Sequence, residues 1–326
     1  MIMNRRKFGL LAGAMATSVG FAGSRAFAAE DKQLVYICAG IEAPFWRYVS
    51  IGAEAAAKAH GYSYSALDSR NNAQAQIQNA QDAASKKVTG IVLSPTDSST
   101  APAVLDIESK AGIPVSFAGI GTVSGDYVTF VTSNDEEGAY DTGKQLAKAF
   151  ADKGWKNAKV GMVTISQARQ NGVMRTNGFV KAMTEAGHTI VARNEMQLYT
   201  ADETFRYVQD MLTAHPDLRG LFVQTDTPTL GAIRAVDAMR RTGETLVAAF
   251  DGVPEFIDLI KSGKLVASGM QQPYEMGRQA GETVIAKIEG KTPEKKVVLP
   301  ILVVTKENVD EILPKIKLSV FAGEMK

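Results

Sequence analysis

Short runs of apolar residues alternate along the chain with longer segments in which apolar residues recur every three or four positions. The short runs are typical of buried strands, and the longer segments have the period of amphipathic helices. The alternation runs once up to about residue 133 and then restarts, continuing to residue 250. Repeated strand–helix units of this kind predict parallel sheets that helices cover on both faces.

Each round of the pattern predicts one doubly wound lobe of an α/β protein. In the first round, strands are predicted at Leu34–Ala39, Tyr62–Leu67, Gly90–Ser94, Pro114–Ala118 and Val128–Thr132, with helices at Phe45–His60, Ala73–Lys87 and near Ala103–Ala111. In the second round, strands are predicted at Lys159–Ile165, Thr189–Ala192, Gly220–Gln224 and Leu246–Phe250, with helices at Asp135–Asp152, Gly172–Ala186, Asp202–Thr213 and Thr229–Arg241.

The first 28 residues have the pattern of an export signal. Basic residues at Arg5–Lys7 precede a mildly apolar stretch, Leu10–Phe21, and Ala26–Ala28 forms a small–x–small cleavage pattern. The stretch is too short and too rich in Gly, Ser and Thr to span a hydrocarbon core about 30 Å thick. The adjacent arginines resemble the twin-arginine class of signals. The sequence therefore predicts a signal peptide over residues 1–28 and export to a bacterial periplasm.

Composition narrows the class of protein that follows this leader. The chain is 45% hydrophobic and 22% charged, which excludes a disordered or collagen-like protein. Beyond residue 28, 32 basic residues face 35 acidic ones, whereas a general nucleic-acid binder carries a basic excess. The single cysteine, Cys38, can form neither an internal disulfide nor a thiolate metal site.

Residues that directly follow the predicted strands are the candidates for a site, because open α/β sheets bind ligands at the carboxyl ends of their strands. These residues are Glu42–Trp46, Ser94–Ser98, Gly119–Gly121, Ser133–Asp135, Ser166–Arg175, Tyr199, Thr225–Asp226, Asp251–Gly252 and Met270–Pro273. None of these groups has the arrangement of a catalytic site. They are instead typical of the walls of a ligand-binding cleft.

Several phrases at and near these positions carry a resemblance to a known family. They are Ala43-Pro44-Phe45-Trp46, Leu67-Asp68-Ser69-Arg70-Asn71-Asn72, Pro95-Thr96-Asp97-Ser98, Arg175-Thr176-Asn177-Gly178-Phe179, Leu212-Thr213-Ala214-His215-Pro216-Asp217, Phe250-Asp251-Gly252 and Met270-Gln271-Gln272-Pro273. In their order and spacing, the chain resembles a type I periplasmic solute-binding protein of the ribose-binding branch that serves ABC importers. The resemblance runs from about Gln33 to Val304.

The resemblance implies two lobes joined by a three-strand hinge, with a ligand bound between lobes that close over it. Crossings between the lobes are expected near Ser133, Gln271 and Pro300. The N-terminal lobe would comprise residues 32–133 plus 272–300, and the C-terminal lobe residues 134–271 plus 301–326. The expected partners are a small-molecule ligand and an ABC permease at the inner membrane, and the protein is expected to be a monomer that binds no nucleic acid.

The resemblance also implies which residues contact the ligand. Phe45 and Trp46 are expected to stack on the apolar C–H faces of a sugar ring. Arg175 offers five donors in a fixed fork, and Asp251 can accept from two vicinal hydroxyls. Gln271 is expected as a hinge amide that both donates and accepts. Further contact positions of the family fall at Thr225, Tyr199 and Asn134, the last of which could belong to the hinge instead.

Departures from the family pattern bear on the identity of the ligand. Sugar-binding relatives carry an Asp-Arg pair where this chain has Gly119-Ile120, and the asparagine expected before Pro44 is Ala43. The first lobe therefore lacks most of its hydroxyl-binding groups. We expect a ligand with one polar and one less polar edge, such as a deoxysugar, a short polyol or a small cyclic compound, and weak ribose binding. Glu42 restores polarity, or meets a cationic group, if it faces inward.

Three alternatives to a transport protein share part of this pattern. A periplasmic sensor that presents its ligand to a chemoreceptor or histidine kinase would use the same fold. The effector domain of a repressor is disfavoured by the export signal and by the lack of an N-terminal helix-turn-helix. An enzyme would need a nucleophile–base pair, which we do not find, so we expect a binding protein without a cofactor.

Two further motifs are weak. The segment Gly138–Gln145 resembles a phosphate-binding P-loop, but it ends in Gln where a Mg²⁺-binding Ser or Thr is required, and three acidic residues precede it. The three histidines, His60, His188 and His215, are scattered near predicted helix ends, so no metal site is predicted.

Overall fold

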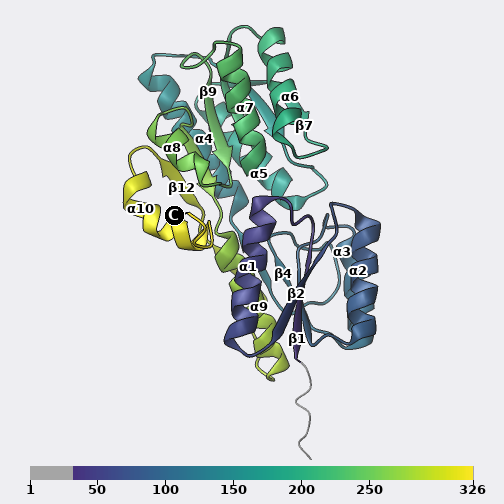
Figure 1. The fold of residues 1–326 in the computed structure, drawn as a ribbon. Helices are drawn as coiled ribbons and strands as arrows, with labels where there is room; N and C mark the ends of the chain where they lie inside the picture. The colour runs from purple at the N-terminus through teal and green to yellow at the C-terminus, as the bar shows by residue number, and fades with distance from the viewer. Residues whose placement is uncertain (1–31, 326) are drawn as a thin grey trace, which may run out of the picture. The chain divides into compact units, whose positions relative to one another are not determined.

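The computed structural model describes residues 32–325, so the predicted signal peptide at residues 1–28 lies outside the described residues. Within residues 32–325, twelve strands form two six-stranded sheets. Sheet A has the order β11-β5-β4-β3-β1-β2, and sheet B has the order β12-β10-β9-β8-β6-β7. Each sheet and its helices form one α/β lobe (Figure 1). The expected class, two doubly wound lobes, is confirmed.

The lobe of sheet A takes its elements from two separate parts of the chain. They are β1 (Gln33–Cys38), α1 (Pro44–Ala59), β2 (Ser63–Asp68), α2 (Ala73–Lys86), β3 (Gly90–Leu93), α3 (Ala101–Ala111), β4 (Val115–Ala118) and β5 (Phe130–Ser133), followed much later by α9 (Pro273–Ile288) and β11 (Lys296–Leu299). Helices α1 and α9 lie together on one face of the sheet, and α2 and α3 lie on the other (Figure 1).

The lobe of sheet B contains the middle of the chain and its C-terminal helix. Its elements are α4 (Asp135–Asp152), β6 (Lys159–Thr164), α5 (Gln170–Glu185), β7 (Thr189–Glu195), α6 (Ala201–Ala214), β8 (Leu218–Val223), α7 (Asp226–Ala238), β9 (Leu246–Phe250), α8 (Glu255–Lys261), β10 (Ala267–Met270), β12 (Leu302–Thr305) and α10 (Val309–Ser319). The predicted strands and helices up to Phe250 match these elements closely, with ends that differ by up to three residues.

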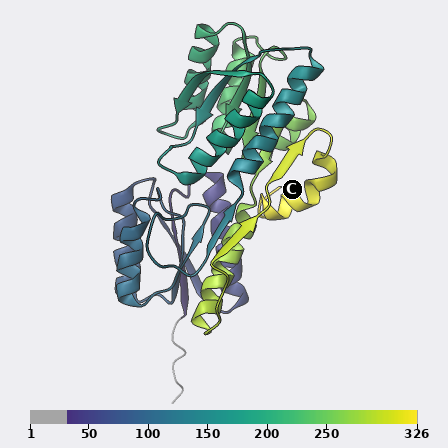
Figure 2. The ribbon, with the colours of Figure 1, turned by 180° about the vertical axis from the view of Figure 1, so that it is seen from behind.

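The chain passes between the sheets three times, after β5, after β10 and after β11. Seen from behind, β11 in one lobe is followed directly by β12 in the other (Figure 2). All strand pairs are parallel except β10–β12, which departs from the purely parallel sheets expected. The two other crossings lead into a helix that returns the chain to the far end of a sheet. Strand β12 has no such helix before it, so it enters sheet B from the carboxyl ends of the other strands.

Close helix packing fixes the position of α1, whose N-terminus faces the other lobe. A Cβ at Gly52 of α1 would lie 1.9 Å from the carbonyl oxygen of Tyr274, and a Cβ at Gly277 of α9 would lie 1.9 Å from that of Val49. The backbones of α1 and α9 therefore touch at both glycines. Because protein interiors are close-packed, this contact holds the first turn of α1 in a defined place.

Candidate functional site

A cavity of about 540 Å³ lies between the lobes, at the carboxyl ends of the strands in both sheets. This is the place that the topology of open α/β sheets predicts for a ligand. Its volume suits a small molecule rather than a polymer. The cavity is lined by Gly40, Glu42, Ala43, Pro44, Phe45, Trp46, Asp68, Arg70, Asn71, Gly119, Ile165, Arg169, Asn171, Arg175, Leu198, Tyr199, Thr200, Ala201, Thr225, Asp226, Thr227, Pro228, Asp251 and Gln271.

The lobe of sheet A contributes an aromatic wall. Pro44 begins helix α1, where its missing N–H costs nothing, and the next two residues are Phe45 and Trp46. Their rings pack edge to face, with centroids 4.7 Å apart and planes at 87°. Such a pair is rigid, so it presents a flat apolar surface with little loss of side-chain entropy when a ligand binds.

Trp46 also explains the glycine at position 119. Gly119 has φ +81°, and a Cβ built there would lie 3.3 Å from the Trp46 ring. An aspartate at this position would need both a strained backbone and a shift of the indole. The Trp46 ring therefore occupies the space that a side chain at position 119 would need.

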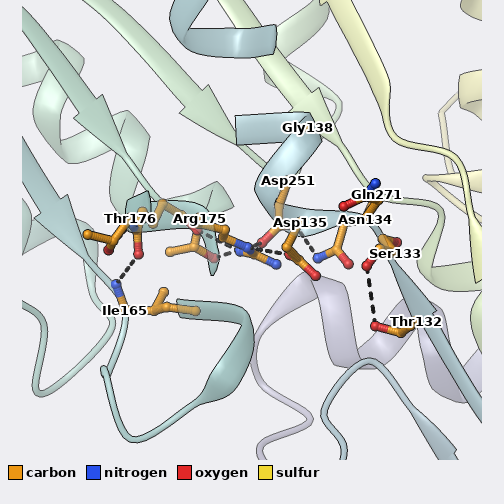
Figure 3. A network of polar contacts seen from close by, with 12 residues as sticks. Thr132, Ser133, Asn134, Asp135, Gly138, Ile165, Arg175, Thr176, Asp251 and Gln271 are labelled. Atoms are coloured by element: carbon orange, nitrogen blue, oxygen red, sulfur yellow. Dashed lines mark hydrogen bonds and ion pairs between the residues drawn. The ribbon is translucent and has the colours of Figure 1, made fainter. Parts of the chain in front are cut away.

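The lobe of sheet B contributes a buried polar network centred on Arg175 of α5 (Figure 3). Its Nε donates to Asp135 Oδ1 at 2.8 Å, and its Nη1 donates to Asp251 Oδ2 at 3.0 Å and to the Gln224 carbonyl oxygen at 2.7 Å. Gln271 Nε2 donates to the other Asp251 oxygen at 2.7 Å. Arginine, carboxylate and amide therefore hold one another in fixed orientations before any ligand arrives.

Burial and charge act against each other in this network. Burial raises the pKa of Asp135 to about 6, although the Arg175 guanidinium lowers it. Burial also works against the charge of Arg175, but Asp251 and Asp135 together keep its pKa above the ordinary value. Burial, together with the charge of Asp251, raises the pKa of Asp226 to about 7. The polar wall is therefore a low-dielectric site, where hydrogen bonds to a ligand are stronger than in water.

Unusual backbone conformations are concentrated at the cavity. Eight non-glycine residues among those described have positive φ, and four of them line the cavity: Arg70, Asn71, Tyr199 and Asp251. The left-handed region is unfavourable for residues with a Cβ, and such strain persists where the surrounding structure enforces it. Asp251 is one such case, since its N–H is held by the carbonyl oxygen of Gly269 at 3.0 Å. This clustering supports a functional role for the cavity.

Most of the predicted site residues meet at this cavity. Those that line it are Glu42, Phe45, Trp46, Gly119, Arg175, Tyr199, Thr225, Asp251 and Gln271. Asn134 does not line the cavity, because its side chain accepts from the Glu137 N–H and caps α4. Ile120 is 2% exposed and packs in the apolar core of sheet A instead of facing the cavity.

Four lining residues belong to candidate segments or family phrases of the sequence but were not predicted individually as ligand contacts: Asp68, Asn71, Arg169 and Asp226. Asp68 ends β2, and the other three lie in the segments that follow β2, β6 and β8, so their position in the fold was available. What the sequence did not show is which of several polar neighbours turns inward, because that depends on loop conformation.

The weaker motifs have structural explanations. The P-loop-like segment Gly138–Gln145 lies inside helix α4, where it forms no phosphate-binding loop. Cys38 is fully buried in β1. His188 accepts from the Ala158 N–H at 3.1 Å. Among residues 32–325, no group of three His, Cys, Asp or Glu side chains could hold a metal ion.

Comparison with protein families decides the relationship of the chain. A model of the "Periplasmic binding protein domain" family matches residues 34–292. The chain belongs to this family. No helix in the described part of the chain is long and apolar enough to cross a membrane.

Individual relatives agree with the family match. The chain is 28% identical over 309 residues to the ribose import binding protein of Escherichia coli K12, which covers 94% of this chain and 100% of the relative. It is 24% identical to the D-allose-binding periplasmic protein of the same organism, over 90% of this chain and 96% of the relative. A carbohydrate transporter solute binding protein from Agrobacterium radiobacter, solved with D-arabinose, shares the fold at a TM-score of 0.83 and 24% identity, with 90% and 100% covered.

Proposed function

We propose that the chain is the periplasmic solute-binding component of an ABC importer, which binds a sugar or a sugar-like small solute and delivers it to an inner-membrane permease. One observation carries this proposal. A small cavity between two lobes has an aromatic wall from one lobe and the Arg175–Asp251–Gln271 network from the other. This is the chemistry that a ring with apolar faces and hydroxyl edges requires. The described residues offer no nucleophile–base pair at the cavity, so we propose a binding protein that carries out no reaction.

The proposed mechanism is a population shift between open and closed forms. A ligand that contacts both lobes binds the closed form more tightly and therefore favours it. We take residues 32–133 plus 272–300 as one lobe and 134–271 plus 301–326 as the other. Membership of the strands in sheets A and B supports this division, and the three crossings between the sheets are the natural hinge.

The proposed ligand is a monosaccharide, deoxysugar, polyol or small cyclic compound with one less polar edge. Gly119 supports this choice, because it leaves the lobe of sheet A with aromatic surface where a hydroxyl-binding side chain would stand. A site built to bind a hydroxyl rejects ligands that leave its polar groups unpaired, but an apolar wall imposes no such demand. We therefore expect weak ribose binding, and a sub-micromolar ribose affinity by calorimetry would contradict this specificity.

A thermal-shift screen tests the proposed function directly. Protein without its first 28 residues is screened against sugars, polyols and small cyclic metabolites. A ligand present at one hundred times its dissociation constant stabilises the folded protein by about 2.7 kcal/mol. Mass spectrometry of the incubated ligand tests for turnover. Recovery of a chemically altered solute would show an enzyme instead.

The proposed periplasmic location and export route are tested in cells. Replacing Arg5 and Arg6 by lysine is expected to block processing and leave the precursor in the cytoplasm if the twin-arginine route is used. Export that survives this change would show a plain secretory signal.

A further inference from the structure

Arg169 connects the two lobes directly across the cavity. It lies at the start of α5 in the lobe of sheet B. Its Nε donates to the carbonyl oxygen of Thr96 at 2.9 Å, and its Nη2 donates to Asn71 Oδ1 at 2.9 Å. Both acceptors belong to the lobe of sheet A, in the segments that follow β3 and β2. These two hydrogen bonds require the lobes to be close together.

The charge of Arg169 is buried without a direct ion-pair partner among the described residues, and the Asp97 carboxylate supports it only from a distance. The residue is 7% exposed, and among the described residues no carboxylate oxygen lies within 4 Å of its guanidinium. Burial lowers its pKa. The ring of Tyr199 lies 5.1 Å from the guanidinium carbon and supplies a cation–π contact, but no negative charge. Arg175, in the same cavity wall, has two carboxylate partners. A buried cation without a counter-ion is costly, so its presence calls for a partner that the chain does not supply.

One end of the Arg169 guanidinium is available to a ligand. Nε and Nη2 are bonded across the cleft, whereas Nη1 donates to no group among the described residues. Nη1 is not one of the solvent-inaccessible polar atoms that lack a hydrogen-bond partner. Nη1 is therefore not enclosed by protein atoms, and it belongs to a side chain that lines the cavity. A guanidinium bound on one edge and free on the other can bind an acceptor in a fixed direction.

We propose that Arg169 couples ligand recognition to lobe closure: Nη1 binds an oxygen acceptor of the solute while Nε and Nη2 hold the opposite lobe. This inference rests on the proposed function. The acceptor oxygen can come from a hydroxyl or ring oxygen of a neutral sugar, or from the carboxylate of a sugar acid. The lack of a direct ion-pair partner favours the carboxylate, because an anion in contact with Arg169 would neutralise the buried charge.

The test compares wild-type protein with the variants Arg169→Met and Arg169→Lys. Arg193→Met is the matched control, since Arg193 is an exposed arginine of the same lobe that does not line the cavity. The probes are D-arabinose, D-allose and myo-inositol, together with D-galactose and D-galacturonate, which differ at one carbon. Affinity and dissociation rate are measured by calorimetry and stopped-flow fluorescence. Small-angle scattering of the ligand-free proteins reports how open they are.

We expect Arg169→Met to weaken every probe that binds by at least tenfold, through faster dissociation, and to give a larger radius of gyration. Arg169→Lys should be intermediate, and Arg193→Met should stay within twofold of wild type. A preference of wild type for D-galacturonate over D-galactose that is lost in Arg169→Met identifies a carboxylate partner. Equal losses for both identify a neutral oxygen.

Two failures are distinguishable. If wild-type protein binds its solutes and Arg169→Met keeps their affinity within twofold, the role of Arg169 is refuted and the proposed function stands. If wild-type protein binds no probe and no solute of the wider screen, the proposed function fails and ligand recognition by Arg169 fails with it. An unchanged radius of gyration in Arg169→Met refutes the bridging role in either case.

Discussion

Replacing Arg175 by methionine tests whether the polar wall is held together by its buried ion pairs. The side chains of Arg175 and Asp135 are each 2% exposed, and that of Asp251 is 5% exposed. Methionine fills much of the same volume but leaves both carboxylates without a cation. Breaking a buried ion pair by removing one partner costs about 3–5 kcal/mol. Total stabilities of folded domains are only about 5–15 kcal/mol, so the loss at pH 8 should be large.

The expected cost depends on pH, and the sign follows from the orphaned carboxylates. Burial raises the pKa of Asp135 to about 6 even with Arg175 present. Removing the guanidinium takes away the group that lowers this pKa, so in the folded variant it lies further above the unfolded value of about 3.9. The folded variant then binds protons that the unfolded chain releases, so its stability falls as pH rises above about 4. The difference between wild type and variant should therefore be smaller at pH 5 than at pH 8.

Urea unfolding followed by circular dichroism at both pH values measures this difference. Arg278→Met is the control, because Arg278 bonds to Glu275 with its side chain 38% exposed. Exposed pairs of this kind contribute about 0–1 kcal/mol. The reasoning is refuted if Arg175→Met costs no more than Arg278→Met, or if its cost does not change between pH 5 and pH 8.

Three further predictions follow from other parts of the structure. Glu108 is fully buried with both carboxylate oxygens unpaired, and burial raises its pKa to about 8. The folded protein therefore loses stability as the pH rises from about 4.5 to 8. Glu108→Gln should raise the melting temperature at pH 9 but hardly change it at pH 5. Trp46→Ala should weaken the identified solute at least tenfold by calorimetry, whereas Trp155→Ala, outside the cavity lining, should leave its affinity unchanged. Gly277→Ala should cost about 3 kcal/mol in urea unfolding because its Cβ meets backbone, compared with about 1 kcal/mol for Gly61→Ala, where only the positive φ matters. Equal effects of the two tryptophan variants, or of the two glycine variants, would contradict the corresponding prediction. An effect of Glu108→Gln that does not change with pH would contradict the first one.

The hydrophobic pattern predicts the strands and helices up to Phe250 because each is set by a local period. Strands covered on both faces, such as β1 and β3, are nearly continuous apolar runs. Helix α4 begins after the cap of Asn134, with acidic residues in its first turn as the helix dipole favours. The pattern did not predict the elements after Phe250, where the strands are short and the chain passes twice between the lobes. It also did not predict the antiparallel direction of β12.

Within the site, the sequence predicts residue type and approximate place, and the structure decides direction. Phe45 and Asp251 follow strands, so the topology places each at the ligand-binding edge of its own sheet, and the packing of the lobes brings them to one cleft. Asn134 also follows a strand, but its amide caps a helix and lies outside the cavity lining. A post-strand position is therefore not sufficient for a place in the site.

The sequence by itself determined the α/β class, the repetition of the strand–helix unit and the candidates at strand ends, because these depend on periods of a few residues. Only the tertiary structure decided that Arg175 is neutralised by Asp135 and Asp251, and that Arg169 reaches Asn71 across the cleft. Those partners are separated by 40, 76 and 98 positions. Contacts at such separations depend on how distant segments pack, within one lobe for Arg175 and between the lobes for Arg169, and no local pattern records this.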